Sequence, residues 1–177
     1  MDWPIVSEFL LALQAIVDAL YSILLCFRKL TMTYNHVALI GLGLISSSIA
    51  LSLRRWNKST KITGTSRSVE TRRKAAKLGI CEVKDNAIET VRGADLIILC
   101  VPVGAMQAAV QEFASELSPG VTVTDVGSVK VEVIASIVPS LPPGVFFVPG
   151  HPLAGTENSG PESGFATLFD NRWRILT

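Results

Sequence analysis

The chain has 177 residues, of which 49% are hydrophobic and 18% are charged, and its formal net charge is +1. This composition excludes a disordered chain and predicts one globular domain with a large core plus an extension. The near-neutral charge provides no basic surface for nucleic acid, so we expect no such partner. The cysteines Cys26, Cys81 and Cys100 lack metal-ligand spacing and suggest neither a metal site nor disulfides, which favours the cytoplasm.

The first 33 residues differ in character from the rest. From Phe9 to Phe27 the chain is almost entirely apolar, and Asp18 lies near the middle of this run. A membrane span would bury Asp18 at a cost of about 2.5–3.5 kcal/mol. A secretory signal would begin with basic residues, whereas this start is acidic. We favour a third interpretation, an apolar helical extension over residues 1–33 that packs on a partner and is followed by a domain over residues 34–177.

From Tyr34 onward, short apolar runs alternate with segments of helical length. Continuous apolar runs are typical of strands that are buried on both faces, and their alternation with helices is typical of a parallel sheet. We therefore predict an α/β, Rossmann-like fold with a mostly parallel sheet and helices on both faces. The expected strands are His36–Ile40, Ile62–Gly64, Leu96–Val101, Val121–Val126 and Val145–Val148, with a last strand beginning in residues 173–177, and the expected helices include 44–56, 69–78 and 103–117.

A glycine-containing turn follows the first predicted strand. In the segment Gly41-Leu42-Gly43-Leu44-Ile45, Gly41 permits a tight turn and Gly43 allows the backbone to approach a pyrophosphate. The following helix points its amino-terminal amides toward that charge. Ser46 occupies the position of the usual third glycine, where a small side chain still permits close helix–strand packing. The alternative is that these glycines only form a turn between a strand and a helix and bind no ligand. The position of the turn, after the first strand and before a helix, favours the cofactor-binding interpretation.

The end of the second predicted strand indicates which dinucleotide is preferred. An NAD site usually has an acidic residue here, whereas this chain has Thr65-Ser66-Arg67, followed by Arg72 and Arg73. Arg67 can pair with a 2′-phosphate, and no carboxylate at this position repels one. NADP is therefore favoured over NAD. The alternative is that these arginines only cover a solvated helix face.

The second informative motif is the segment 149–157, Pro-Gly-His-Pro-Leu-Ala-Gly-Thr-Glu. Pro152 restricts the backbone of His151 to extended conformations, and the glycines on either side allow a loop that packs close to a ligand. An imidazole held in this way can exchange a proton near neutral pH. On its own, a loop histidine is more often a surface or structural residue.

Together, these motifs make the chain resemble the prephenate and arogenate dehydrogenases of tyrosine biosynthesis. The resemblance extends from about Asn35 to Thr177 and rests on several independent motifs in the same order. These are Gly41-Leu42-Gly43-Leu44-Ile45, Val101-Pro102, Asp125-Val126-Gly127-Ser128-Val129-Lys130, and Gly150-His151-Pro152 through Gly160-Pro161.

The resemblance implies oxidative decarboxylation of a cyclohexadienyl substrate with transfer of hydride to nicotinamide. It implies that His151 takes up the hydroxyl proton by general-base catalysis, and that Ser128 hydrogen-bonds the substrate hydroxyl or the imidazole. The alternative role of Ser128 is to cap the helix that follows it. Asp125 is expected as a buried hydrogen-bond acceptor without a catalytic role. Further cofactor contacts are implied at Cys100, Val101 and Pro102, and further substrate contacts at Thr156 and Glu157.

Family members continue into a helical second domain that dimerises and supplies part of the substrate pocket, and this chain stops before that domain. We therefore expect a homodimer only when that domain is present. Prephenate and arogenate differ in the side chain that the second domain contacts, so the choice between them stays open. Two alternatives also remain: a truncated cofactor-binding module without activity, and an NADP-linked dehydrogenase of the β-hydroxyacid type that uses a lysine for proton transfer.

Overall fold

The computed structural model describes residues 34–177, and the extension expected over residues 1–33 lies outside this range. A six-stranded sheet forms the centre of the described part, with every neighbouring pair of strands parallel and the order β3-β2-β1-β4-β5-β6. The strands are β1 (His36–Ile40), β2 (Lys61–Thr65), β3 (Glu82–Val83), β4 (Leu96–Leu99), β5 (Thr122–Asp125) and β6 (Phe146–Val148). This order is that of the dinucleotide-binding Rossmann sheet, so the predicted fold class is confirmed.

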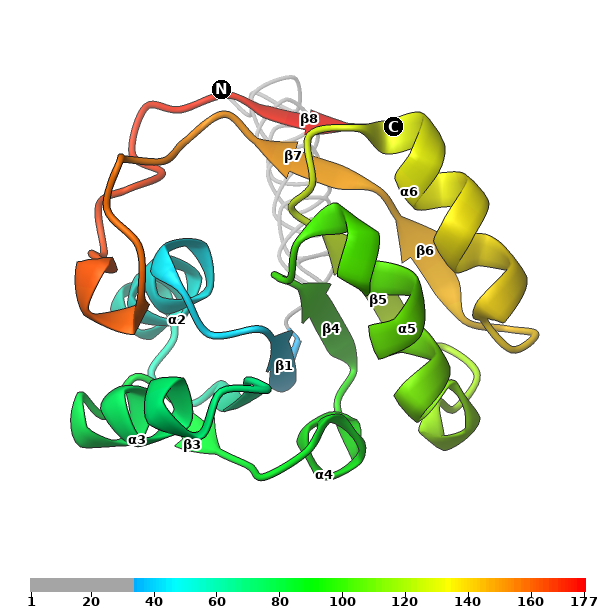
Figure 1. Ribbon diagram of the computed structural model, residues 1–177, viewed down its shortest axis with the longest axis horizontal. Helices are drawn as coiled ribbons and strands as arrows, with labels where there is room; N and C mark the ends of the chain where they lie inside the picture. Colours follow the sequence, from blue (N-terminus) through cyan, green and yellow to red (C-terminus); the bar gives the residue numbers. More distant parts are fainter. Residues whose placement is uncertain (1–33) are drawn as a thin grey trace, which may run out of the picture. The chain divides into compact units, whose positions relative to one another are not determined.

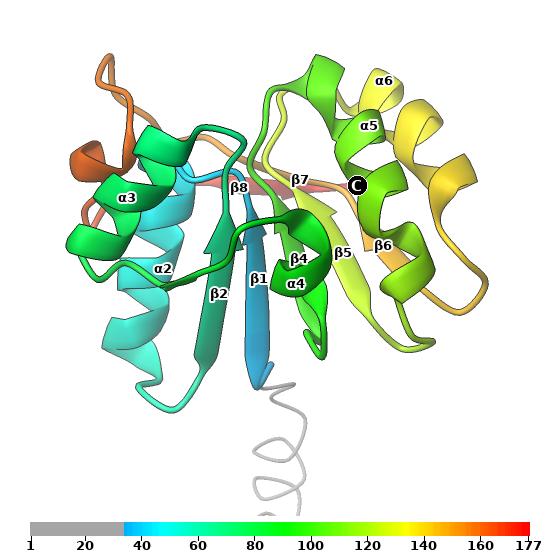
Figure 2. The ribbon, with the colours of Figure 1, turned by 60° about the horizontal axis from the view of Figure 1, so that its bottom comes forward.

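Helices cover both faces of the sheet. Figures 1 and 2 show α2 and α3 on one side and α5 and α6 on the other. The helices are α2 (Leu44–Trp56), α3 (Val69–Lys77), α4 (Ala87–Val91), α5 (Val103–Phe113) and α6 (Lys130–Ile137), with single 3-10 turns at Ala114–Glu116, Val138–Ser140 and Pro161–Ser163. None of the helices within residues 34–177 is long and apolar enough to cross a membrane.

The two layers follow from the alternation of side chains along buried strands. On β1, Val37 and Leu39 pack in the core beneath α2 and α3, whereas Ala38 and Ile40 pack in the core beneath α5 and α6. All five residues of β1 are buried. A strand that is covered on both faces is mostly apolar, and this is why the run Val37–Ile40 was readable in the sequence.

Two elements of the sheet domain were not expected from the sequence, the strand β3 and the helix α4. They contain two and five residues, which is too short for either the strand or the helix periodicity to appear. Asn86 begins α4, because its side-chain oxygen accepts a hydrogen bond from the backbone N–H of Glu89 at 2.8 Å. The pattern Asn-x-x-Glu is a known helix-start signal and would have located this helix.

A separate antiparallel pair of strands follows the sheet and corrects two expectations. His151, expected in a loop, lies in β7 (Gly150–Pro152), and the strand expected to begin in 173–177 is β8 (Arg174–Leu176). Among the described residues these strands pair only with each other, with His151 opposite Ile175. A three-residue strand shows no periodicity, and its pairing depends on a partner more than twenty residues away in the sequence.

The connection between β7 and β8 is held against α2. The hydroxyl of Ser48 accepts a hydrogen bond from the backbone N–H of Phe165 at 3.1 Å, and the hydroxyl of Ser52 donates one to the carbonyl of Ala166 at 2.8 Å. The approach is close because Gly164 has no side chain: a Cβ there would lie 2.4 Å from the Cβ of Ser47. Through these contacts, α2 supports the segment that follows His151.

Candidate functional site

A cavity of about 480 Å³ opens at the carboxyl ends of β1, β2 and β4. The strand order changes direction between β1 and β4, and parallel α/β sheets bind ligands at this position. Most of the predicted cofactor residues line it: Gly41, Leu42, Gly43, Thr65, Ser66, Arg67, Cys100, Val101 and Pro102. Leu44 and Ile45 begin α2 and do not belong to the lining.

The two glycines of the turn have different environments. Gly41 has a φ of +100°, and a Cβ there would lie 2.8 Å from the backbone of Cys100. Its N–H donates a hydrogen bond of 2.9 Å to the carbonyl of Thr65, which ties the turn to the end of β2. A Cβ on Gly43, in contrast, would have no atom within 4 Å. The turn therefore requires Gly41 for the fold, whereas Gly43 leaves open space on the side of the cavity.

Ser46 has a role in the turn that its sequence position alone did not reveal. Its side chain is buried, and its hydroxyl accepts a hydrogen bond of 2.7 Å from the N–H of Gly43 and donates one of 3.1 Å to the carbonyl of the same residue. The first turn of α2 contains no acidic side chain. Its unpaired N–H groups thus remain available for an anion.

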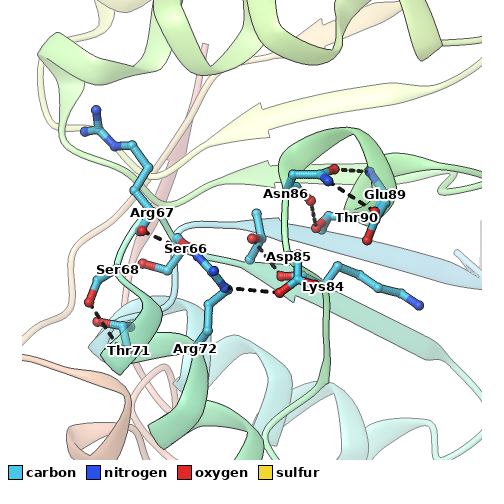
Figure 3. Close-up of polar contacts among 11 residues, drawn as sticks. Ser66, Arg67, Ser68, Thr71, Arg72, Lys84, Asp85, Asn86, Glu89 and Thr90 are labelled. Carbon is cyan, nitrogen blue, oxygen red and sulfur yellow. Dashed lines mark hydrogen bonds and ion pairs between the residues drawn. The ribbon is translucent and has the colours of Figure 1, made fainter.

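The arginines after β2 separate into three roles (Figure 3). The guanidinium of Arg72 donates hydrogen bonds to the carbonyl of Ser66 at 2.6 Å and to that of Arg67 at 3.4 Å, and it lies 3.8 Å from a carboxylate oxygen of Asp85. The side chain of Arg67 is exposed, points away from Arg72 and has no hydrogen-bonding partner within residues 34–177. Arg73 is exposed and outside the lining.

Residues from the β3–α4 connection also line the cavity and were missed in the sequence, because Asp85 lies eighteen positions after Arg67. Asp85 and Asn86 belong to the lining, together with Ala105, Ala108, Ala109 and Glu112 of α5. The carboxylate of Asp85 lies 3.8 Å from Arg72, and its side chain is 90% exposed. A carboxylate is therefore close to the arginine segment, although it does not follow β2 directly.

Cys100 lies at the end of β4 and forms part of the cavity wall. Burial, assisted by the negative charge of Asp125, raises the pKa of its thiol to about 12. The neutral thiol is then the form present near neutral pH. Cys100 therefore contributes to this wall as a small apolar group and not as a nucleophile.

His151 does not line this first cavity. It borders a second, mainly apolar cavity of about 260 Å³ between α2, β4, the end of β5 and the β7–β8 pair. Its Nδ1 lies 3.5 Å from the carbonyl oxygen of Val126. Since a carbonyl only accepts hydrogen bonds, a hydrogen bond at this contact requires the proton on Nδ1, and in the neutral ring with that proton Nε2 bears the lone pair.

Asp125 is the buried acceptor that the sequence indicated. Its carboxylate accepts hydrogen bonds from the N–H of Gly127 at 2.7 Å and from the N–H of Gly150 at 3.1 Å. It also pairs with the ammonium of Lys130, for which the sequence analysis predicted no role. The loop that bears Ser128 and the strand that bears His151 are thus connected through one side chain.

The remaining predicted site residues are exposed. The hydroxyl of Ser128 has no hydrogen-bonding partner within residues 34–177, and the cap of α6 is Val129, so the capping role for Ser128 is not observed. Thr156 and Glu157 lie in the connection after β7, where the Thr156 hydroxyl accepts a hydrogen bond of 3.3 Å from the N–H of Asn158.

The sheet order, the glycine turn and the cavity above it define a dinucleotide-binding domain of the Rossmann type. The family described as "Prephenate dehydrogenase, nucleotide-binding domain" matches residues 49–177, and the chain belongs to this family. The chain is 43% identical over 145 residues to a cyclohexadienyl dehydrogenase of Zymomonas mobilis, a match that covers 81% of this chain and 49% of the relative. A prephenate dehydrogenase of Lactococcus lactis is 36% identical over 146 residues, covering 81% of this chain and 41% of the relative.

Solved structures give the same result. A prephenate dehydrogenase from Aquifex aeolicus, in complex with hydroxyphenyl propionate and NAD+, has a TM-score of 0.75 and 34% identity, over 83% of this chain and 51% of that one. Arogenate dehydrogenase from Synechocystis has a TM-score of 0.72 and 31% identity, over 80% and 49%. The chain therefore spans about half the length of these relatives. A 3-hydroxyisobutyrate dehydrogenase of Mycobacterium tuberculosis, at 18% identity, shares the fold alone.

Proposed function

We propose that this chain binds NADP(H) in the cavity at the carboxyl ends of β1, β2 and β4, and that His151 is the base in the oxidative decarboxylation of prephenate or arogenate. The protein containing it would act in tyrosine biosynthesis in the cytoplasm. The observation that carries this proposal is the cavity of about 480 Å³ that joins the glycine turn to an exposed, unpaired arginine. Membership in the prephenate dehydrogenase family supplies the reaction class.

The residues of the cavity fit a dinucleotide. Gly43 leaves open space beside the first turn of α2, whose N–H groups suit a pyrophosphate, and no acidic side chain opposes it there. The small side chains Ala105, Ala108 and Ala109 leave room along α5 for the flat adenine ring. The nicotinamide of the bound dinucleotide would accept the hydride of the oxidation.

The preference for NADP rests on Arg67. Its guanidinium is exposed and unpaired in the described part of the chain, so it can make a two-pronged contact with a 2′-phosphate. Arg72 holds the carbonyls of this turn and offsets the carboxylate of Asp85 at 3.8 Å. Arg72 is thus paired with Asp85, whereas the charge of Arg67 has no partner in the described part of the chain and is free to meet a phosphate.

The proton transfer rests on the orientation of His151. With Nδ1–H donating to Val126, Nε2 accepts the proton of the substrate hydroxyl as the hydride departs. The free hydroxyl of Ser128 would hydrogen-bond the same substrate oxygen, and Thr156 and Glu157 would border the substrate. His151 lies outside the cofactor cavity, so the substrate would bind between this cavity and the β7–β8 pair. The half of the relatives' length not spanned here would complete the pocket and mediate dimerisation.

The proposal is tested by fluorescence titration of NADPH and NADH against the wild type, Arg67→Ala and Arg73→Ala. Arg73 is the matched control, because it is an exposed arginine six positions further along, on α3, and lies outside the cavity. We expect wild type to prefer NADPH, and Arg67→Ala to lose about 1.5–3 kcal/mol of NADPH binding, or about 10- to 150-fold in affinity. Equal wild-type affinities, or an equal loss in the Arg73 variant, would contradict the proposal.

A further inference from the structure

A buried ion pair lies where β5 ends, next to His151. The side chain of Asp125 is 0% exposed and that of Lys130 is 14% exposed. The carboxylate of Asp125 accepts the N–H groups of Gly127 at 2.7 Å and Gly150 at 3.1 Å. The ammonium of Lys130 donates to this carboxylate and, at 2.6 Å, to the carbonyl of Gly150. Both peptide groups that flank Gly150 are therefore held by the two charged side chains.

We propose that Lys130 is a positioning residue that, together with Asp125, fixes the imidazole of His151 with its proton on Nδ1. Because Gly150 directly precedes His151, the hydrogen bonds to Gly150 fix the backbone position from which the His151 side chain extends. The acceptor of Nδ1 is the carbonyl of Val126, the residue next to Asp125. The ion pair is thus attached to both ends of the Nδ1–H···O contact. The role of Nε2 as the reactive base rests on the proposed function.

The contact is sensitive to small displacements. The distance from Nδ1 to the Val126 oxygen is 3.5 Å, at the outer limit of a hydrogen bond, so a shift of a few tenths of an ångström would break it. The close packing around the ion pair limits such shifts. A Cβ on Gly127 would lie 3.0 Å from Asp125 Oδ2, and one on Gly150 would lie 3.0 Å from the Asp125 carbonyl.

Helix stability alone does not explain a lysine at this position. Lys130 is the first residue of α6, where a positive charge opposes the helix dipole and an acidic residue is the favourable choice. Burial of an ion pair also adds little stability relative to apolar side chains of similar volume. What the ammonium adds is two bonds in fixed directions, one to Asp125 and one to the backbone that precedes His151. This favours a positioning role over a purely structural one.

The tautomer can be measured directly on the 177-residue chain by NMR of 15N-labelled histidine at mildly alkaline pH. The chain contains only two histidines, so buried His36 serves as an internal probe of the native fold. The variants are Lys130→Met and the double variant Asp125→Asn/Lys130→Met, which leaves no unpaired charge buried. Lys77→Met is the matched control, because Lys77 is exposed on α3.

We expect the Nδ1–H form of His151 to dominate in the wild type and in Lys77→Met. In both Lys130 variants, its ratio to the Nε2–H form should fall by about two- to tenfold, the effect of one net hydrogen bond. The His36 signals and the affinity for NADPH should stay unchanged, since Lys130 does not line the cofactor cavity. An unchanged His151 ratio in both variants, or loss of the native His36 signals in both, would overturn the proposal. Failure of the proposed catalytic role would leave this ratio unaffected.

Discussion

The imidazole of His36 and the hydroxyl of Thr63 form a buried hydrogen bond of 2.9 Å between β1 and β2. The Thr63 hydroxyl donates to the carbonyl of Thr90 at 2.7 Å, so it must accept from Nε2–H of the histidine. Desolvation by burial is the largest influence on His36 and lowers its pKa below the ordinary value of 6.5.

This burial predicts a loss of stability at acid pH. Between the lowered pKa and 6.5, the unfolded chain binds a proton at His36 that the folded chain does not. The contribution of neutral, buried His36 to the free energy of unfolding is therefore fully present above pH 6.5 and is lost as the pH falls below that value. For one group, the free energy of unfolding changes by at most about 1.4 kcal/mol per pH unit. Denaturant unfolding across this range should show the slope, and His36→Gln should reduce it. An unchanged slope in the variant would show that other groups cause it.

The substitution Gly41→Ala should destabilise the fold. The added Cβ would be held at a φ of +100° and would lie 2.8 Å from the Cys100 backbone and 2.9 Å from Val101 Cγ1. We expect a loss of about 1–3 kcal/mol in the free energy of unfolding, measured by denaturant titration. Gly155→Ala is the control, because a Cβ there has no atom within 4 Å. Equal stability of the two variants would contradict this assignment of Gly41.

Gly43→Ala should weaken cofactor binding and leave the stability of the fold nearly unchanged. Its Cβ meets no atom within 4 Å in the described structure, so the free energy of unfolding should change little. The methyl group would instead occupy the space assigned to the pyrophosphate, and the affinity for NADPH should fall by roughly tenfold or more. Parallel unfolding and fluorescence titrations separate the two effects. Retained affinity would place the pyrophosphate elsewhere.

In a full-length dehydrogenase that carries this domain, His151→Asn should lower kcat by about 10²–10⁴-fold while NADPH binding is retained. Asparagine keeps a polar contact but cannot accept the proton. Ser128→Ala should lower kcat less, since it removes one hydrogen bond and not the base. Steady-state kinetics with prephenate and arogenate check both variants, and the 177-residue chain alone should show little turnover. Near-normal kcat in His151→Asn would refute the role of the base.

The thiols of Cys81 and Cys100 should react slowly with an aromatic disulfide reagent near neutral pH. Burial raises the pKa of Cys81 to about 11 and that of Cys100 to about 12, so little thiolate is present in the native chain. Both thiols should react rapidly after denaturation. The measurement uses a Cys26→Ser background, because Cys26 lies outside the described residues. Rapid reaction of either thiol in the native chain would contradict the assigned burial.

The sequence determined the elements whose signal is local. The apolar runs at Val37–Ile40 in β1 and at Leu96–Leu99 in β4 are recognisable because strands covered on both faces are mostly apolar. The glycine turn is recognisable because the tight turn between β1 and α2 requires a positive φ at Gly41. The identity of the family followed from motifs that each occupy a few consecutive residues.

Only the tertiary structure decided the contacts between distant segments. The pairing of β7 with β8 depends on a register between residues more than twenty positions apart, and no periodicity in three residues records it. Likewise, Arg72 meets Asp85 thirteen positions away, and Lys130 meets the carbonyl of Gly150 twenty positions away. A charged side chain in a sequence does not specify its partner, because the partner is set by which strand ends the parallel sheet brings together at one edge.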